Sequence, residues 1–505
     1  MTAIPNRLPA KILFGAFAVV CAVLSAKNLV VLVAEAIPGL WSDLTVPRFL
    51  VVAVLVALFF AGVVLAFFRL KKSRGNPDGH SHLLVYCGIL FLAALCLNLL
   101  FTFWVGAPPK SDYLGFYNAT NSTARGDFSF VTGTYWRVWS YQSGFPTFMA
   151  PVAMLFPENI DALLVFGNLF GAGIVVCVFY LLRKLMPEKR AFLFSLGYLL
   201  LPYPYSVGAV FTNQPASAFF LFLGLCFVFS KSPFDLKRCA IGGLCLVVGN
   251  VLRPEGVLIL VSALIASLVV LAAAIRSGST IRGRLKRVVP LAVCCAVYLA
   301  GNALASGIFA WTGANPGGLG NHFPLYKFAV GLNEKSLGRY SGADTRALFL
   351  HDREGDREAR DQFAAELIAE RLSVGPVRLG SLVWNKLDVV WTDRYQAYPA
   401  FSPFEGDHRL HFLGRGVQVG TVKRVFSLFD SLWFVLLFAS CAFVGFRLLK
   451  AGEIATIMLF VAVFLLSAVA AFSLVEAQRR YAFLLMPAVW IMASNSAVLS
   501  KQARH

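Results

Sequence analysis

The chain has 505 residues, of which 58% are apolar and only 14% are charged, and its formal net charge is +19. A soluble domain carries about 25% charged residues, so this chain is too apolar to cover itself with polar surface in water. The composition therefore excludes an ordinary soluble protein. It predicts an all-α polytopic membrane protein, because helices satisfy their own backbone groups in lipid.

The positive charge is spread along the chain and does not form one basic patch. Lys and Arg gather at the ends of apolar runs, for example in segments 69–74 and 276–287. This distribution is typical of the cytoplasmic loops of membrane proteins, where some basic residues also meet anionic lipid headgroups. We therefore expect membrane lipids as partners and no nucleic acid.

A membrane-spanning helix needs about 20 mostly apolar residues. By this criterion we expect about twelve spans, several of them short and interrupted by proline. They lie near residues 12–36, 48–68, 83–105, 162–183, 191–206, 213–230, 239–252, 256–275, 288–311, 428–447, 453–474 and 481–498. The first run lacks a clean cleavage site, so we expect it to be a retained anchor.

Alternating spans place all the basic connections and both termini on one side, the cytoplasm. The other side then receives two long polar segments, residues 106–161 and 312–427, which we name the first and second loop regions. The expected organisation is an N-terminal two-span hairpin with its cytoplasmic loop (1–82), a transmembrane core with the first loop region (83–311), the second loop region (312–427) and a C-terminal three-span segment (428–505).

The second loop region is expected to contain two amphipathic helices that cap the bundle or lie in the membrane interface. A helix over 357–372 places on one face Phe363, Leu367, Ile368 and Leu372. A helix over 376–391 has as its apolar residues Leu379, Leu382, Val383, Leu387 and Val390.

Asp112 is the main candidate for a catalytic residue. It follows the expected span 83–105 by a few residues, so it is expected near the outer membrane surface. A carboxylate there can meet a lipid headgroup and a water-borne acceptor together, and can take a proton as a general base. The alternative is a structural role as the N-cap of a helix over 113–124, because Asp is a preferred cap.

The residues around Asp112 resemble a known family. The pattern S-D-Y-x-x-F-Y-x-A at 111–119, then Tyr135, then Y-x-S-G-F-P-T-F at 141–148, is similar to the first outer loop of GT-C glycosyltransferases. The nearest types are the bacterial protein-mannosyltransferases and aminoarabinose transferases. In that family an Asp shortly after an early span is the proposed base, which implies this role for Asp112. The family's loop usually follows the first span, so spans 12–36 and 48–68 are interpreted as an added hairpin.

Three further stretches resemble the same family. They are Arg253-Pro-Glu255-Gly at the outer end of a short span, the segment 327–344, and Glu476-x-x-x-Arg480-Tyr481 followed by Pro487. The resemblance implies a GT-C-like helical bundle with a helical extracytoplasmic loop region. It also implies a polyprenyl-phosphate-linked sugar as the donor.

Arginines are expected to bind the phosphate of such a donor. Negative charge builds on the phosphate as the sugar leaves, and arginine binds phosphate bidentately while staying charged. The candidates are Arg253, Arg479 and Arg480, all at expected outer helix ends. The alternative is that they snorkel to the interface or pair with Glu255 or Glu476.

The other substrate-binding candidates are mostly aromatic. Tyr113, Tyr117, Tyr135 and Tyr481 suit contacts with a sugar, although aromatic residues of this kind also form interfacial belts. Asp127 is a candidate acceptor-site residue, with a solvated loop residue as the alternative. The histidines of the loop regions are irregularly spaced, so we expect no metal site and no cofactor.

These observations predict a hexosyltransferase of the GT-C type in the cell membrane. It would move a sugar from a polyprenyl-phosphate donor to an extracytoplasmic glycan, lipid or protein of the cell envelope. One alternative is a polysaccharide polymerase or ligase that acts on lipid-linked glycans. A second is a transporter, for which Lys27 is the main charged residue within a span.

Overall fold

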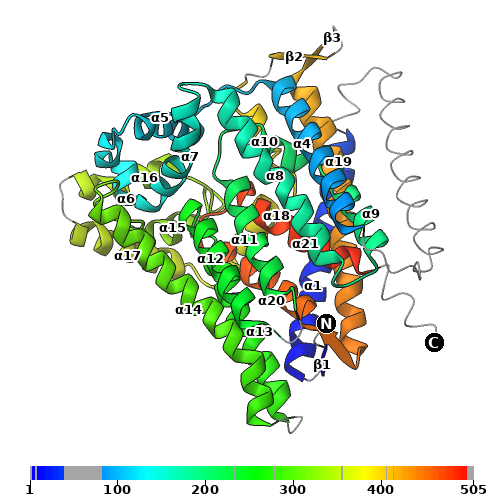
Figure 1. Ribbon diagram of the computed structural model, residues 1–505. Helices are drawn as coiled ribbons and strands as arrows, with labels where there is room; N and C mark the ends of the chain where they lie inside the picture. The colour runs from blue at the N-terminus through cyan, green and yellow to red at the C-terminus, as the bar shows by residue number, and fades with distance from the viewer. Residues whose placement is uncertain are drawn as a thin grey trace.

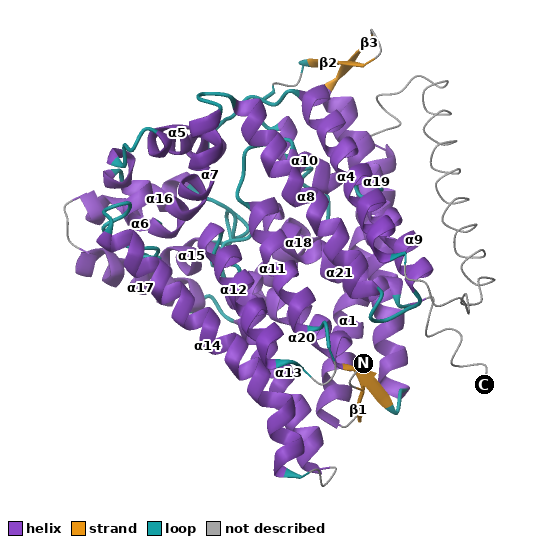
Figure 2. Cartoon of the chain, viewed as in Figure 1, coloured by secondary structure: helices purple, strands orange, loops and turns teal. Residues whose placement is uncertain are grey.

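The computed structural model describes residues 3–5, 8–38, 82–231, 234–276, 280–353, 357–404, 407–412 and 415–496. The described chain is almost entirely helical (Figure 2). Within it, seven helices are long and apolar enough to cross a membrane, which agrees with a polytopic helical membrane protein. They are α1 with its π-helical end (Leu8–Val31 and Leu32–Ala36), α4 (Leu83–Val105), α8 (Ile160–Leu182), α13 (Gly256–Arg276), α14 (Ile281–Trp311), α19 (Val419–Lys450) and α20 (Thr456–Leu474).

The expected number of about twelve spans is not confirmed. Span 48–68 lies outside the described residues. Four other expected spans are shorter elements, namely α9 (Glu188–Tyr198) with α10 (Pro202–Gly208), α11 (Gln214–Val228), α12 (Leu236–Leu252), and the 3₁₀ segment η5 (Arg479–Leu485) with α21 (Met486–Ser494). Pro202, Pro215 and Pro487 lie in the first turns of α10, α11 and α21. Proline lacks an N–H and suits that position, so it starts a new helix there and keeps each element short.

The central helices pack closely through small residues. A Cβ atom added at Gly224 on α11 would lie 2.9 Å from the carbonyl oxygen of Gly242 on α12. Side chains at these positions would push the two backbones apart, as in other membrane helix pairs that depend on small residues. The pair α11 and α12 supports the segment that ends at Arg253.

Two short antiparallel ladders lie at the ends of the bundle. Strand β1 (Ala3–Pro5) pairs with β4 (Glu453–Ala455), and β2 (Arg409–Phe412) pairs with β3 (Arg415–Gln418). The first ladder places the start of the chain beside the connection between α19 and α20. This is the arrangement that alternating spans predict for the basic side.

The first loop region contains α5 (Asp112–Ala124), α6 (Thr134–Val138), α7 (Gly144–Leu155) and 3₁₀ turns at Ser129–Thr132 and Ser140–Ser143. The second contains α15 (Pro324–Gly331), α16 (Gly342–Arg353), α17 (Arg357–Leu372), α18 (Pro376–Trp391) and a 3₁₀ turn at Pro399–Phe401. Helices α5, α6 and α7 of the first loop region and α15, α16 and α17 of the second lie together on one side of the long helices (Figure 1). Backbone bonds join the two regions, because His322 N–H donates to Val138 C=O over 2.9 Å. The Trp139 ring also lies 5.2 Å from that of Tyr326.

The two helices expected in the second loop region are confirmed with the predicted ends. On α17, Phe363, Leu367 and Ile368 pack into the apolar cluster of α15 and α16, whereas Leu372 is exposed because the helix ends there. Helix α18 packs against α20 and η5, and its last turn is buried on all sides. Although it belongs to the second loop region, α18 therefore packs within the helical bundle.

A buried ion pair joins α18 to the first helix. Lys27 Nζ lies 2.9 Å from an Asp388 carboxylate oxygen, and both side chains are 7% exposed. The ammonium also lies 3.9 Å from the centre of the Trp384 ring. The charge within the first span is therefore neutralised by the second loop region.

Breaking this pair should destabilise the protein strongly. Asp388→Asn leaves Lys27 buried without a full counter-charge, which typically costs about 3–5 kcal/mol. Thermal unfolding in detergent should show a clearly lowered midpoint, and Lys27→Met in the same chain should restore most of the loss. The control is Arg125→Gln, which breaks the exposed Arg125–Glu158 pair and should change stability by about 1 kcal/mol or less. Equal effects of the two single variants would contradict a structural role for the buried pair.

Candidate active site

A cavity of about 1270 Å³ lies between the two loop regions and the segment before α21. Its wall includes the start of α5, parts of α6, α15 and α16, residues 395–402, and residues 476–480. Charged and aromatic side chains dominate this wall. It is therefore the place in the described chain where several of the sequence-predicted candidates meet, Asp112 and Arg480 among them.

Asp112 and Arg480 form an ion pair on the wall of this cavity. Arg480 Nη1 donates to Asp112 Oδ2 over 3.0 Å, although the two residues are 368 positions apart. Burial alone would lower the pKa of Arg480, but Tyr481, Tyr113 and Asp112 together raise it above its ordinary value. The arginine is therefore a permanent cation beside the carboxylate.

Asp112 is not the cap of the helix that it begins. It is the first residue of α5, and the preceding Ser111 occupies the cap position without a side-chain cap bond. Ser111 has φ 54°, a value that non-glycine residues rarely adopt. The carboxylate of Asp112 accepts its hydrogen bond from Arg480.

Arg253 lies one layer behind the cavity wall. Its Nε is 2.5 Å from Glu255, its Nη1 donates to Asn213 over 3.2 Å, and its guanidinium faces the Tyr481 ring at 5.6 Å. Glu255 therefore pairs with an arginine, which is one of the alternatives that the sequence predicts for these residues. Asn213 also donates to Gln142, which lines the cavity. Arg253 thus reaches the site through Tyr481 and Asn213.

Glu476 pairs with a lysine, whereas the sequence suggested an arginine. It forms a close ion pair with Lys327 and accepts hydrogen bonds from Gln478 and Tyr481. Burial alone would raise the pKa of Glu476, but the charge and hydrogen bond of Lys327 bring it below its ordinary value. The backbone explains the choice of partner, because the segment before Arg479 is extended at Val475 and Gln478. A helical spacing would have placed Glu476 beside Arg480.

Arg479 turns away from Arg480 into the protein. It is 4% exposed, donates to the Val390 carbonyl over 2.8 Å, and lies over the rings of Tyr203 and Phe434. Burial raises the pKa of the neighbouring Asp393 to about 6, against the effect of Arg479. Arg479 reaches the cavity wall, but its described hydrogen bond is to backbone.

The remaining sequence candidates divide into two groups. Tyr113 and Tyr135 line the cavity, and burial raises the pKa of both hydroxyls. Tyr117 donates to the Glu158 carbonyl over 2.7 Å and is not among the lining residues. Asp127 is exposed in a turn, where the Ser129 N–H lowers its pKa. The structure therefore brings Asp112, Tyr113, Tyr135, Arg479 and Arg480 together on one wall.

Lys386 is a residue that the sequence reading missed. Its buried ammonium donates to the carbonyls of Gly331, Ser473 and Val475 over 3.0, 3.0 and 2.6 Å. Burial lowers its pKa to about 8 while Glu476 acts in the opposite direction, so the ammonium form prevails at neutral pH. A lysine on the apolar face of a predicted helix, four residues from Leu382 and from Val390, was the available signal.

The Lys386 bonds belong to a clamp on the segment that carries Glu476 and Arg480. Glu476 N–H donates to the Lys327 carbonyl over 2.8 Å, and Ala477 N–H donates to the Gly338 carbonyl over 2.7 Å. A Cβ atom at Gly331 would lie 2.4 Å from the Val475 carbonyl carbon. The second loop region therefore presses directly on the end of α20 and holds it in place.

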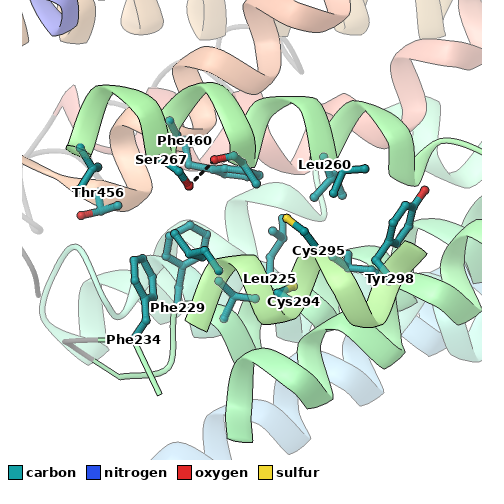
Figure 3. Close-up of a pocket in the computed structure, with 17 residues that line it drawn as sticks. Leu225, Phe229, Phe234, Leu260, Ser267, Cys294, Cys295, Tyr298, Thr456 and Phe460 are labelled. Carbon is teal, nitrogen blue, oxygen red and sulfur yellow. Dashed lines mark hydrogen bonds between the residues drawn. The ribbon is translucent and has the colours of Figure 1, made fainter. Parts of the chain in front are cut away.

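A second cavity, within the helical bundle, has a different character. It has a volume of about 40 Å³ and lies between α11, α13, α14 and α20. Figure 3 shows Phe229, Leu260, Cys294 and Phe460 around it, and none of its 17 lining residues is charged. It is too small and too apolar to hold a polar substrate.

Removing the Lys386 ammonium should loosen the clamp. Lys386→Met leaves three buried carbonyls without this donor, and each unsatisfied group costs about 1–3 kcal/mol. We expect a lower unfolding midpoint in detergent and increased proteolysis near residues 475–480. Lys335→Met, at an exposed position of the same loop region, is the control and should behave as wild type. An unchanged midpoint for Lys386→Met would contradict the clamp.

The structure is similar to solved structures of an oligosaccharyltransferase from Archaeoglobus fulgidus. The enzyme AglB in complex with an inhibitory peptide and a dolichol-phosphate is 14% identical, with a TM-score of 0.43 over 81% of this chain and 50% of that chain. A form tethered to an acceptor peptide is 13% identical with a TM-score of 0.44, and the apo form is 12% identical with a TM-score of 0.39.

The chain spans about half the length of these archaeal proteins. No protein-family model and no curated protein matches the sequence. The structural neighbours are oligosaccharyltransferases, but TM-scores at this level carry no argument about activity.

Proposed function

We propose that this chain is a glycosyltransferase that takes its sugar from a polyprenyl-phosphate donor. The observation that carries the proposal is the Asp112–Arg480 pair on the wall of a large polar cavity, at the end of an apolar bundle. Sugar transfer from a lipid phosphate needs a base for the acceptor and a cation for the phosphate. The pair supplies both side by side.

In the proposed reaction, the acceptor hydroxyl attacks C1 of the sugar and the bond from C1 to the phosphate oxygen breaks with inversion. Asp112 takes the proton of the hydroxyl, and the electron pair of the broken bond remains on the phosphate. Arg480 uses Nη1 for Asp112, while its buried Nε has no partner among the described residues. N–H groups of the guanidinium are thus left for the phosphate, which arginine can bind bidentately.

The aromatic wall suits a sugar. Tyr113, Tyr135, Trp139 and Tyr326 line the cavity, and aromatic rings offer apolar faces with a polar edge. Because burial raises the pKa of Tyr135, its hydroxyl stays protonated at neutral pH and can donate to a sugar oxygen. Specific sugar contacts would come from these hydroxyls.

The setting also suits a lipid-linked donor. The apolar helices would hold the polyprenyl chain in the membrane, and the loop regions would place the phosphate at the extracytoplasmic surface, with both termini cytoplasmic. The acceptor would be a glycan, lipid or protein of the cell envelope. Lys27, on which the transporter alternative depended, is paired with Asp388.

Replacing the proposed base should abolish most turnover without loss of the fold. Asp112→Asn keeps the size of the side chain but cannot take a proton at neutral pH, so release of polyprenyl phosphate from a lipid-linked hexose should slow by about 10²–10⁴-fold. Donor binding should remain near normal. Asp161→Asn, in the exposed first turn of α8, is the matched control. Near-wild-type turnover by Asp112→Asn would contradict the role of Asp112 as the general base.

The two arginines should differ in their effect on donor binding. Arg480→Gln removes a charge-assisted contact on the wall, worth roughly 1.5–3 kcal/mol, so the Kd for polyprenyl phosphate in nanodiscs should rise about tenfold or more. Arg253→Gln, one layer behind, should have a smaller effect. The exposed Arg378→Gln is the control. Unchanged binding by Arg480→Gln would leave it as a structural partner of Asp112 alone.

A further inference from the structure

The cavity wall has more basic residues than its acidic residues can neutralise. Its charged residues are two acids and six bases, namely Asp112, Glu476, Lys327, Arg339, Arg346, Lys423, Arg479 and Arg480. Both acids are paired, Asp112 with Arg480 and Glu476 with Lys327. Arg479 is buried beside Asp393 and bonds to backbone. The residues left over are Arg339, Arg346 and Lys423.

Three described acids of the second loop region pair with other cations. Asp344 accepts two bonds from Arg371, at 2.9 and 3.0 Å, and Glu334 pairs with Arg378. Asp388 pairs with Lys27 and Arg394. Among the side chains that the structure describes, none places a carboxylate within ion-pair distance of Arg339, Arg346 or Lys423.

One of the three cations, Arg339, is positioned by a neighbouring aromatic ring. The Arg339 guanidinium lies over the Tyr395 ring, 4.6 Å from its centre, and both residues line the cavity. Stacking of this kind holds the planar group while leaving its N–H edge for a ligand. Lys423 is half-buried at the start of α19. A cleft lined by charges of one sign concentrates ions of the opposite sign.

The size of the cavity allows a second ligand. Pockets that bury one small ligand usually measure about 300–1,000 Å³, and this cavity measures about 1270 Å³. A lipid phosphate at Arg480 and a sugar at the tyrosines would leave part of the volume unfilled. The unpaired cations face this same space.

We propose that Arg339, Arg346 and Lys423 form a second anion-binding subsite, for a phosphate or carboxylate group that the substrates carry besides the phosphate at Arg480. The inference rests on the proposed function and deepens it, because it adds an anionic group to the acceptor or to the donor. The anion has two possible sources: an acidic acceptor, or a second phosphate on the donor lipid.

The test uses inorganic triphosphate as a soluble probe, titrated calorimetrically into the full-length protein in phosphatidylcholine nanodiscs saturated with polyprenyl monophosphate. We expect the wild type to bind triphosphate in addition to the lipid, with an affinity that falls as salt is added. The double variant Arg339→Gln/Arg346→Gln should bind it about tenfold or more weakly. The control Lys335→Gln/Lys189→Gln removes the same charge at exposed positions off the cavity wall and should bind as wild type.

The subsite is overturned if triphosphate does not bind the lipid-saturated wild type, or if the two double variants bind it equally. Polyprenyl diphosphate then identifies the source. If the diphosphate lipid displaces triphosphate, the subsite holds the donor's second phosphate; if triphosphate still binds, the subsite serves an acidic acceptor. Should the monophosphate lipid itself not bind, the proposed function fails, and the same variants titrated without lipid still decide the subsite.

Discussion

The arrangement of the site depends on how residues 475–480 are held between α20 and α21. This segment has extended backbone at Val475 and Gln478, so it cannot satisfy its polar groups as a helix would. Lys386 donates hydrogen bonds to the carbonyls of Ser473 and Val475 at the end of α20. The Gly338 carbonyl accepts a hydrogen bond from the Ala477 N–H. Arg480 can pair with Asp112, which lies in the first loop region, only when this segment is fixed.

The same constraint explains why two loop regions are needed. The first supplies the carboxylate, the second supplies Lys327 and the clamp, and the short segment between α20 and α21 supplies Glu476 and Arg480. Each of these charges is unfavourable in a largely apolar protein unless it is paired. The pairs across the three segments therefore stabilise the fold and place opposite charges on one wall.

The parts of this arrangement that depend on local sequence pattern can be predicted from the sequence. Helical periodicity predicts α17 and α18. The position beside apolar runs and the resemblance of the surrounding stretches indicate Asp112 and Arg480. The number of spans did not follow, because Pro202, Pro215 and Pro487 divide apolar runs into short elements whose lengths depend on packing.

Long-range partners were harder to predict. Glu476 was assigned to a neighbouring arginine because the residues are close in sequence, but an extended backbone sends it to Lys327, 149 positions away. The role of Lys386 could not be predicted, because its partners are backbone carbonyls and these are not recognisable from residue types. For Arg253 the sequence predicts either a phosphate contact or a pair with Glu255; the pair is present, but the further contacts with Asn213 and Tyr481 come from segments that are distant in sequence.

The Lys27–Asp388 pair has a consequence for the synthesis of the chain. The two residues are 361 positions apart, and a ribosome adds about 5–20 residues per second. Lys27 therefore enters the membrane roughly 20–70 s before its partner has been made. During that interval its ammonium has to reach toward the lipid headgroups or water, as lysine side chains do. The helix that carries Lys27 can therefore settle at its final depth only after α18 has been made.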